Sequence, residues 1–192
     1  MSKFLVSMTI GLVWLSFTIT VNADPIMFDF EKATYPGGPV AIEAYMEDLY
    51  GSDITVTGAR VGDGSLHGPL GPDQYLEAGP SWGTHYIEIS FNDVPITAVS
   101  FDWGVESDAF HAYADGVEFF SQGYGVWSWG STGPIAFASP VTTLRFTDSW
   151  LGEIEVDNLE VAPVPEASTL MLFGSGLSGL LFLARKKRLI KF

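Results

Sequence analysis

The sequence contains no cysteine among its 192 residues. That absence excludes disulfide bridges, thiolate metal sites and a cysteine nucleophile. The fold must therefore be stabilised by a packed apolar core. The roughly 140 residues between the two apolar ends of the chain are enough to bury such a core without covalent cross-links.

Basic residues are scarce in the middle of the chain. Residues 24–164 contain three of them, Lys32, Arg60 and Arg145, and twenty-two acidic residues, which gives this segment a net charge of −19. Nucleic-acid binding needs a clustered positive field, so we expect no nucleic-acid partner. The other basic residues flank apolar segments at the two ends of the chain.

Recognisable catalytic motifs are also missing. The three histidines, His67, His85 and His111, have no HExxH or comparable spacing, and no G-x-S-x-G element is present. A glycoside hydrolase needs two carboxyl groups that face each other across a cleft. With twenty-two acids in the segment, the sequence singles out no pair. We therefore predict no enzymatic activity, and a glycoside hydrolase is the least favoured alternative.

The N-terminus has the parts of a secretory signal peptide. Lys3 precedes an uncharged apolar run, residues 4–19, and Val21-Asn22-Ala23 places compact residues three and one positions before a cut. We predict that signal peptidase cleaves after Ala23, so that residues 1–23 are the signal peptide. An uncleaved anchor is the alternative, and either way the following domain leaves the cytoplasm.

The C-terminus is predicted to form one transmembrane helix. Residues 167–184 carry no charge, and as a helix they would span about 27 Å, close to a hydrocarbon core of about 30 Å. The basic tail, 185–192, should stay cytoplasmic under the positive-inside rule. Its charged cluster consists of Arg185, Lys186, Lys187 and Arg188. This orientation puts residues 24–166 outside.

The order of features at this end resembles the PEP-CTERM sorting domain of Gram-negative bacteria. A short motif precedes the apolar helix and the terminal basic cluster, within residues 163–192. The motif is Val164, Pro165, Glu166, Ala167 and Ser168. The resemblance implies that a membrane-embedded exosortase recognises the motif and cuts near it, and that the protein accompanies exopolysaccharide. Ala167 stands where the commonest family pattern has a second proline, and a plain single-pass anchor is the alternative.

Between the two ends, residues 24–162 are predicted to form one all-β domain. In residues 85–91, Ile87, Ile89 and Phe91 share one face and polar side chains share the other. Similar runs occupy residues 97–103, 110–114, 117–121, 141–147 and 154–161. Their spacing, with turn residues such as Asp115-Gly116 between them, favours an antiparallel β-sandwich or jelly roll.

Two segments depart from simple alternation. Residues 42–49 carry apolar side chains at helical spacing between Pro39 and Gly51, which predicts one short helix covering an edge or end of the sandwich. Residues 154–161 contain a phase slip, because the apolar residues before Asp157 and those after Asn158 have opposite parity. A β-bulge at Asp157-Asn158 would absorb the extra residue.

The segments Phe28-Asp-Phe-Glu31 and Val156-Asp-Asn-Leu-Glu-Val161 carry a second resemblance. They are similar to the first and last strands of jelly-roll carbohydrate-binding modules, in which those strands lie side by side. The resemblance implies a structural calcium bound by Glu31 and Asp157, with Asp29 as a further ligand; calcium prefers six to eight oxygens. Alternatively, these are ordinary strand-edge acids in a very acidic protein. No other cofactor is predicted.

Aromatic residues in glycine- and serine-rich segments are the candidates for sugar contacts, because the C–H faces of sugars stack on flat rings. Segment 124–132 contains Tyr124, Trp127 and Trp129, and Trp82 lies between Ser81 and Gly83. Trp150 is a further candidate. The alternative is a core role, since large aromatic side chains mostly pack inside proteins.

Together these features favour a non-catalytic exported envelope or extracellular-matrix protein, associated with exopolysaccharide. The alternative is a carbohydrate-binding module with a structural calcium. The expected partners are signal peptidase, an exosortase-like membrane enzyme, the membrane through the C-terminal helix, and exopolysaccharide. The expected location is the cell envelope, cell surface or medium, after a stage as a single-pass membrane protein.

Overall fold

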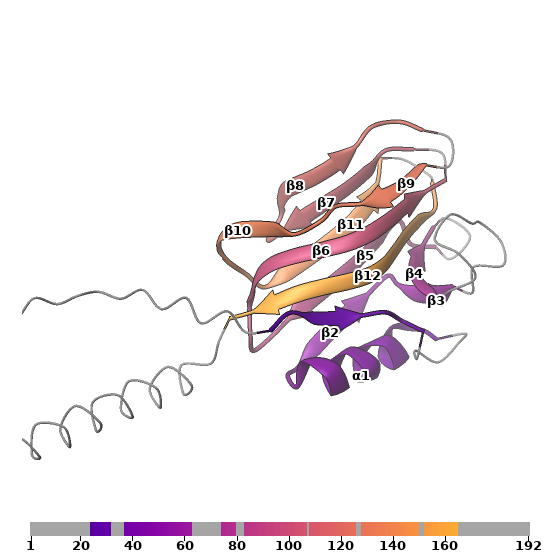
Figure 1. Ribbon diagram of the computed structural model, residues 1–192. Coiled ribbons are helices and arrows are strands. Elements are labelled where there is room, and N and C mark those ends of the chain that lie inside the picture. The colour runs from indigo at the N-terminus through magenta and orange to yellow at the C-terminus, as the bar shows by residue number, and fades with distance from the viewer. Residues whose placement is uncertain are drawn as a thin grey trace, which may run out of the picture.

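The computed structural model describes residues 24–31, 37–62, 74–79, 83–106, 108–125, 128–149 and 152–164. They form two antiparallel sheets packed face to face, with one helix at an edge (Figure 1). The predicted all-β sandwich with one short helix is confirmed. The predicted signal peptide, 1–23, and transmembrane helix, 167–184, lie outside the described residues. Among the residues that are described, no helix is long and apolar enough to cross a membrane.

The larger sheet has seven strands and is built around the last strand of the chain. Its order is β10-β6-β12-β4-β3, with β1 also paired to β12 and β9 also paired to β6. The strands are β1 (Ile26–Phe28), β3 (Arg60–Gly62), β4 (Tyr75–Ala78), β6 (Ile96–Val105), β9 (Ser128–Ser131), β10 (Ile135–Val141) and β12 (Ile154–Pro163). The first and last strands therefore lie side by side, as the resemblance to jelly-roll carbohydrate-binding modules implies.

The smaller sheet has five strands in the order β2-β5-β11-β7-β8. They are β2 (Ile54–Thr57), β5 (Tyr86–Phe91), β7 (Phe110–Ala114), β8 (Val117–Gln122) and β11 (Thr143–Asp148). The predicted run 141–147 is divided between the sheets, because Val141 pairs with Ile96 in the larger sheet while β11 begins at Thr143 in the smaller one. The oxygen Oδ1 of Asp115 accepts the backbone N–H groups of Thr142 and Thr143 at this crossing, at 3.0 and 2.9 Å.

Alternating side chains from both sheets meet in the core. In β5, Ile87, Ile89 and Phe91 are fully buried while the intervening residues are half-buried. Aromatic rings join the two layers, with ring centroids 5.0 Å apart for Phe101 and Phe146. Burial of these side chains supplies the stabilisation that other proteins obtain from disulfides.

The helix α1 (Pro39–Tyr50) covers the edge strand β2, beside β1 (Figure 1). It begins at a proline and ends before Gly51, whose φ of 71° is the left-handed conformation that favours glycine. Two of its carboxylates accept backbone N–H groups of β2: Glu43 from Val56 at 2.8 Å and Glu47 from Ile54 at 3.2 Å. The helix thereby satisfies donors that an exposed edge strand would leave open.

The predicted bulge in β12 is present. Asp157 lies opposite Asp102 on β6, whereas Glu160 lies opposite Ser100, so β12 carries one more residue than β6 in this interval. Asn158 takes a φ of 46° to accommodate it, a conformation in which asparagine is more common than most residues. The bulge returns the apolar residues after it to the core.

Candidate functional site

The outer face of the five-stranded sheet carries two cross-strand rows of polar and aromatic side chains. Residues paired across neighbouring strands point to the same face of a sheet. One row is Glu88, Arg145, Tyr113 and Glu118, on β5, β11, β7 and β8. The next row is Tyr86, Thr147, His111 and Ser121 on the same strands.

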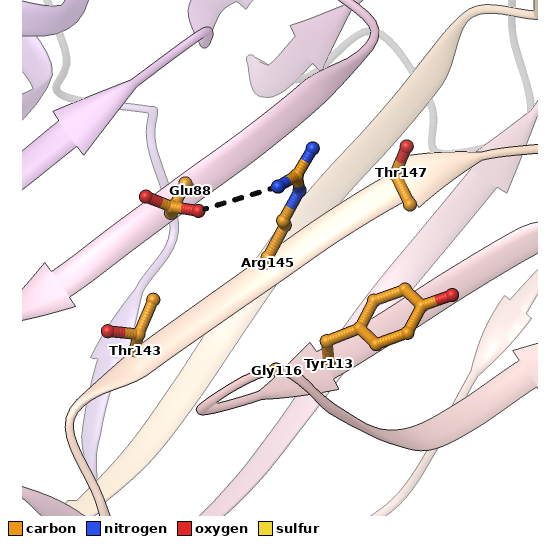
Figure 2. Close-up of a pocket in the computed structure, with 6 residues that line it drawn as sticks. All are labelled: Glu88, Tyr113, Gly116, Thr143, Arg145 and Thr147. Atoms are coloured by element: carbon orange, nitrogen blue, oxygen red, sulfur yellow. Dashed lines mark ion pairs between the residues drawn. The ribbon is translucent and has the colours of Figure 1, made fainter.

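These rows border an open hollow of about 390 Å³, which we name the sheet-face hollow (Figure 2). Its lining consists of Glu88, Tyr113, Gly116, Thr143, Arg145 and Thr147. Figure 2 shows the side chain of Arg145 between Glu88 and Thr147, with the Tyr113 ring on the neighbouring strand. The lining thus combines a cation, a carboxylate, hydroxyl groups and a ring.

Arg145 is held in place by two neighbours. Its guanidinium carbon lies 4.3 Å from the centroid of the Tyr86 ring, and its Nη1 lies 3.9 Å from Oε2 of Glu88. The second distance is longer than a hydrogen bond, so Glu88 leaves the guanidinium N–H donors available. The side chain is 47% exposed, and those donors can reach a ligand in the hollow.

Glu118 fixes two side chains at the rim of the hollow. Hydrogen bonds from Ser121, His111 and Tyr113 lower the pKa of the Glu118 carboxyl, with Ser121 the largest cause. His111 lies between this carboxylate and a serine: its Nδ1 is 3.1 Å from Oε2 of Glu118 and its Nε2 is 2.9 Å from Oγ of Ser149. These contacts hold the imidazole and the phenol in fixed orientations beside the hollow.

This arrangement suits a ligand with many hydroxyl groups and a flat apolar side. The guanidinium can donate to neighbouring hydroxyl oxygens, Glu88 can accept from hydroxyl groups, and the Tyr113 ring offers a face for C–H contacts. The two carboxylates Glu88 and Glu118 outweigh the single positive charge of Arg145. A polyanion therefore gains little electrostatic attraction from this site.

The two residues predicted as sugar contacts that the structure describes, Tyr124 and Trp129, do not line the hollow. Tyr124 is 77% exposed between β8 and β9, and Trp129 is 55% exposed on β9 of the other sheet. Trp82, Trp127 and Trp150 lie outside the described residues. The role of all five as sugar contacts stays a prediction.

Sequence reasoning missed the hollow, because its residues come from strands that are separated along the chain. Two weak signals were present. Tyr86 and Glu88 occupy the polar face of an alternating strand, and Arg145 is one of three basic residues in residues 24–164. Only the strand pairing brings these residues together.

The three acids predicted as calcium ligands have hydrogen-bond partners of their own. Asp29 accepts the Tyr45 hydroxyl at 2.9 Å, and Glu31 accepts the N–H of Gln74 at 3.2 Å. Asp157 is 3% exposed and accepts the N–H of Asn158 at 2.7 Å. Within the described part of the chain, no three acidic or histidine side chains gather as a metal-binding group. The calcium site stays a prediction.

Two acids that the sequence did not single out are buried on the outer face of the larger sheet. Glu77 and Glu155 lie opposite each other on β4 and β12, and they are 3% and 4% exposed. Arg60, opposite Glu77 on β3, makes an ion pair with it. Burial raises the pKa of each carboxyl to about 7.

The sorting motif begins where the sandwich ends. The N–H of Val164 donates to the carbonyl oxygen of Pro95 at 2.8 Å, which fixes the end of β12 to the body of the domain. The remaining motif residues, Pro165, Glu166, Ala167 and Ser168, and the basic cluster 185–188 lie outside the described residues.

Comparison with known proteins identifies the tail. Residues 163–188 match the PEP-CTERM protein-sorting motif. A CBM29-2 mutant complexed with mannohexaose aligns over 73% of this chain and 92% of its own, with 12% identity and a TM-score of 0.44. A family 29 carbohydrate-binding module aligns over 59% and 80%, with 14% identity and a TM-score of 0.39. No curated protein sequence matches the chain.

Proposed function

We propose that this PEP-CTERM-bearing chain is a non-catalytic protein of the cell surface or extracellular matrix that binds polysaccharide through the sheet-face hollow. The sorting motif implies export and a surface or extracellular location. The hollow is the observation that carries the binding function, because it gathers ring faces, hydroxyl groups and a guanidinium on one exposed face.

The ligand we propose is a neutral polysaccharide. Residues 24–164 carry a net charge of −19, and that charge repels polyanions at low ionic strength. Hydroxyl groups of a neutral sugar both donate and accept, so they match the carboxylate acceptor of Glu88 and the guanidinium donors of Arg145. The stacked position of Arg145 also reduces the side-chain entropy that binding would otherwise cost.

Burial argues against a glycosidase. A carboxylic acid with a pKa near 7 is suited to act as a general acid, but Glu77 and Glu155 are 3% and 4% exposed. Glu77 is also engaged by Arg60. A sugar cannot reach either carboxyl group without displacing the residues around it.

The hydrogen-bonded series Ser149–His111–Glu118 provides a direct test of the non-catalytic proposal. Ser149, His111 and Glu118 are connected in the order in which hydrolases connect a serine nucleophile, a histidine base and an acid. We nevertheless expect Ser149 to stay unreactive, because Glu118 is shared with Ser121 and Tyr113 and is 43% exposed. A fluorophosphonate probe should not label the full-length chain. Labelling that disappears in Ser149→Ala would overturn the proposal.

Processing of the tail is proposed from the motif, as are the partners it implies. An exosortase-like membrane enzyme would cut near Pro165-Glu166, after signal peptidase has removed residues 1–23 and the C-terminal helix has held the chain in the membrane. Intact-mass measurement on protein from the native envelope and medium tests this. Loss of both ends is expected, whereas a mass that extends to Phe192 in every fraction would contradict cleavage.

Affinity electrophoresis tests the binding function. Full-length protein in detergent is run through gels containing mannan, dextran or hydroxyethyl cellulose, and at least one of these neutral polymers should retard it. Arg145→Ala should weaken the retardation, while Gln122→Ala, on an exposed position of β8 outside the hollow, should not. Equal migration of wild type in all gels, or unchanged retardation of Arg145→Ala, would refute the site.

A further inference from the structure

We infer that the outer face of the seven-stranded sheet is a second contact surface for neutral polysaccharide, so that one molecule bridges two polysaccharide chains. This inference rests on the proposed function, because it requires the sheet-face hollow to bind the first chain. The second surface runs along β6 between β9 and β12, and we name it the Trp129 strip. It is defined by Trp129, Gly104, Asp102, Asn158, Ser100 and Ala98.

One end of the strip is an exposed indole opposite a glycine. Trp129 is 55% exposed and lies directly opposite Gly104 on β6. The adjacent Trp103 points into the core, where its ring centroid is 5.6 Å from that of Phe110, which confirms that Gly104 and Trp129 face outward. Gly104 has no side chain of its own, and the side chain of Glu155 on β12 lies over it. An exposed indole of this kind can stack on the C–H face of a sugar ring.

The middle of the strip carries preformed hydrogen-bonding groups. Nδ2 of Asn158 donates to Oδ2 of Asp102 at 2.9 Å, and Oγ of Ser100 donates to Oε2 of Glu160 at 3.0 Å. The bulge makes this possible, because it turns Asn158 outward between buried neighbours. A carboxylate that has one protein donor can still accept from sugar hydroxyl groups.

The far end of the strip is flat and apolar. Ala98 pairs with Ala136 on one side and Ala162 on the other, so small side chains form the surface there. A shallow hollow of about 80 Å³ lies beside them, bordered in part by Pro25 and Pro134. From Ala98 to Gly104, β6 extends about 20 Å at about 3.4 Å per residue. The strip therefore suits an extended polymer better than a compact ligand.

Charge selects a neutral polymer for this surface as well. Asp102 and Glu160 are acidic, and none of the residues of the strip that the structure describes is basic. An anionic polymer would place its charges against these carboxylates without a compensating cation. A neutral polysaccharide meets them only with hydroxyl groups.

The two surfaces point in opposite directions. The sheets that carry them pack through a shared core, in which Phe101 and Trp103 of one sheet contact Phe146 and Phe110 of the other. Packed sheets lie about 10 Å apart, so a rigid stretch of polysaccharide cannot lie on both outer faces at once. Occupation of both surfaces thus links two chains, or two distant parts of one chain.

Agglutination of polysaccharide-coated beads measures bridging separately from binding. The beads carry the neutral polymer that retards the wild type most, and the full-length protein is used in detergent. Wild type should agglutinate the beads. Trp129→Ala and Arg145→Ala should each still bind single beads, with at least about threefold weaker affinity, and should fail to agglutinate them. The double variant should lose binding as well.

Controls separate failure of the inference from failure of the proposed function. Trp129→Phe retains a ring and should agglutinate the beads, unlike Trp129→Ala. Ala136→Arg should prevent agglutination by blocking the far end of the strip without touching the indole. If Arg145→Ala alone abolishes binding, the strip does not bind and the bridging inference fails while the hollow stands. If Trp129→Ala alone abolishes binding, the sheet-face hollow does not bind polysaccharide, and the bridging inference fails with the proposed site. Agglutination by Trp129→Ala at the wild-type level would also overturn the inference.

Discussion

The guanidinium group of Arg145 lies over the ring of Tyr86, 4.3 Å from its centroid, on an exposed sheet surface. Tyr86 pairs with Thr147, two residues along β11 from Arg145, so the contact is diagonal across two strands. An exposed contact between a cation and a ring contributes about 0.5–1 kcal/mol. Its value for binding is that it fixes the plane of the guanidinium before a ligand arrives.

Arg145→Lys should therefore weaken polysaccharide binding while leaving the fold intact. Lysine keeps the charge but loses the planar donors and the stacked geometry. We expect affinity in the gel assay to fall about two- to fivefold, which corresponds to 0.5–1 kcal/mol. The melting temperature should change by less than about 4 °C. Tyr86→Leu should have a similar effect, and full affinity in both variants would show that the stacking is irrelevant.

Stability should fall as pH rises from about 4.5 to about 7, because Glu155 is buried. Its carboxyl has a pKa of about 7 in the folded chain, against a usual 4.5. Between these values the folded state holds a proton that the unfolded state has lost, so the free energy of unfolding decreases with pH across this window. Above pH 7 the charged form is buried, and the full penalty is present.

Glu155→Gln removes the penalty of burying a charged carboxylate and therefore tests this prediction. Relative to wild type, the variant should gain about 2 kcal/mol in the free energy of unfolding at pH 8 and much less at pH 4.5. Urea unfolding at the two pH values checks this. Glu160→Gln, on the same strand but half-buried, serves as the matched control. An equal effect of Glu155→Gln at both pH values would contradict the raised pKa.

The bulge residue Asn158 should tolerate glycine but not valine. Both substitutions remove the amide that donates to Asp102, so their difference isolates the cost of the backbone conformation at φ 46°. A β-branched residue in this region costs about 1–2 kcal/mol more than glycine. Thermal unfolding of Asn158→Gly and Asn158→Val measures the difference. Equal melting temperatures would mean that the bulge relaxes on substitution.

Calcium should raise the melting temperature if the predicted ligands Glu31 and Asp157 bind it. A cation that binds only the folded state stabilises it according to its concentration and affinity. EDTA should lower the melting temperature of the full-length chain, and excess calcium should restore it. Asp157→Asn should abolish the response, whereas Glu160→Gln should keep it. If EDTA leaves the melting temperature unchanged, the prediction of a structural calcium is wrong.

Much of the fold can be predicted from the sequence, because short-range sequence patterns agree with the final packing. Alternation in residues 85–91 fixes which side chains of β5 enter the core, and the parity change around Asp157 requires a bulge. Pro39 and Gly51 mark the ends of the helix for reasons internal to the backbone. These features depend on near neighbours along the chain.

The division of residues 141–147 between two sheets depends on distant partners instead. Val141 belongs to one sheet because Ile96 is opposite it, and nothing in the local alternation signals the change. The hollow is hidden for the same reason, since Glu88, Arg145 and Tyr113 become neighbours only through the order β5-β11-β7. Burial of Glu77 and Glu155 is likewise set by the pairing of β4 with β12.

The position of β12 has a mechanical consequence. This strand is the last element before the sorting motif, it lies between β6 and β4, and β1 also pairs with it. A pull on the tail along the strand axis would load its hydrogen bonds to these neighbours in shear, all at once, instead of peeling them apart singly. The described domain therefore leads into the sorting motif through a strand that resists extraction along its own axis.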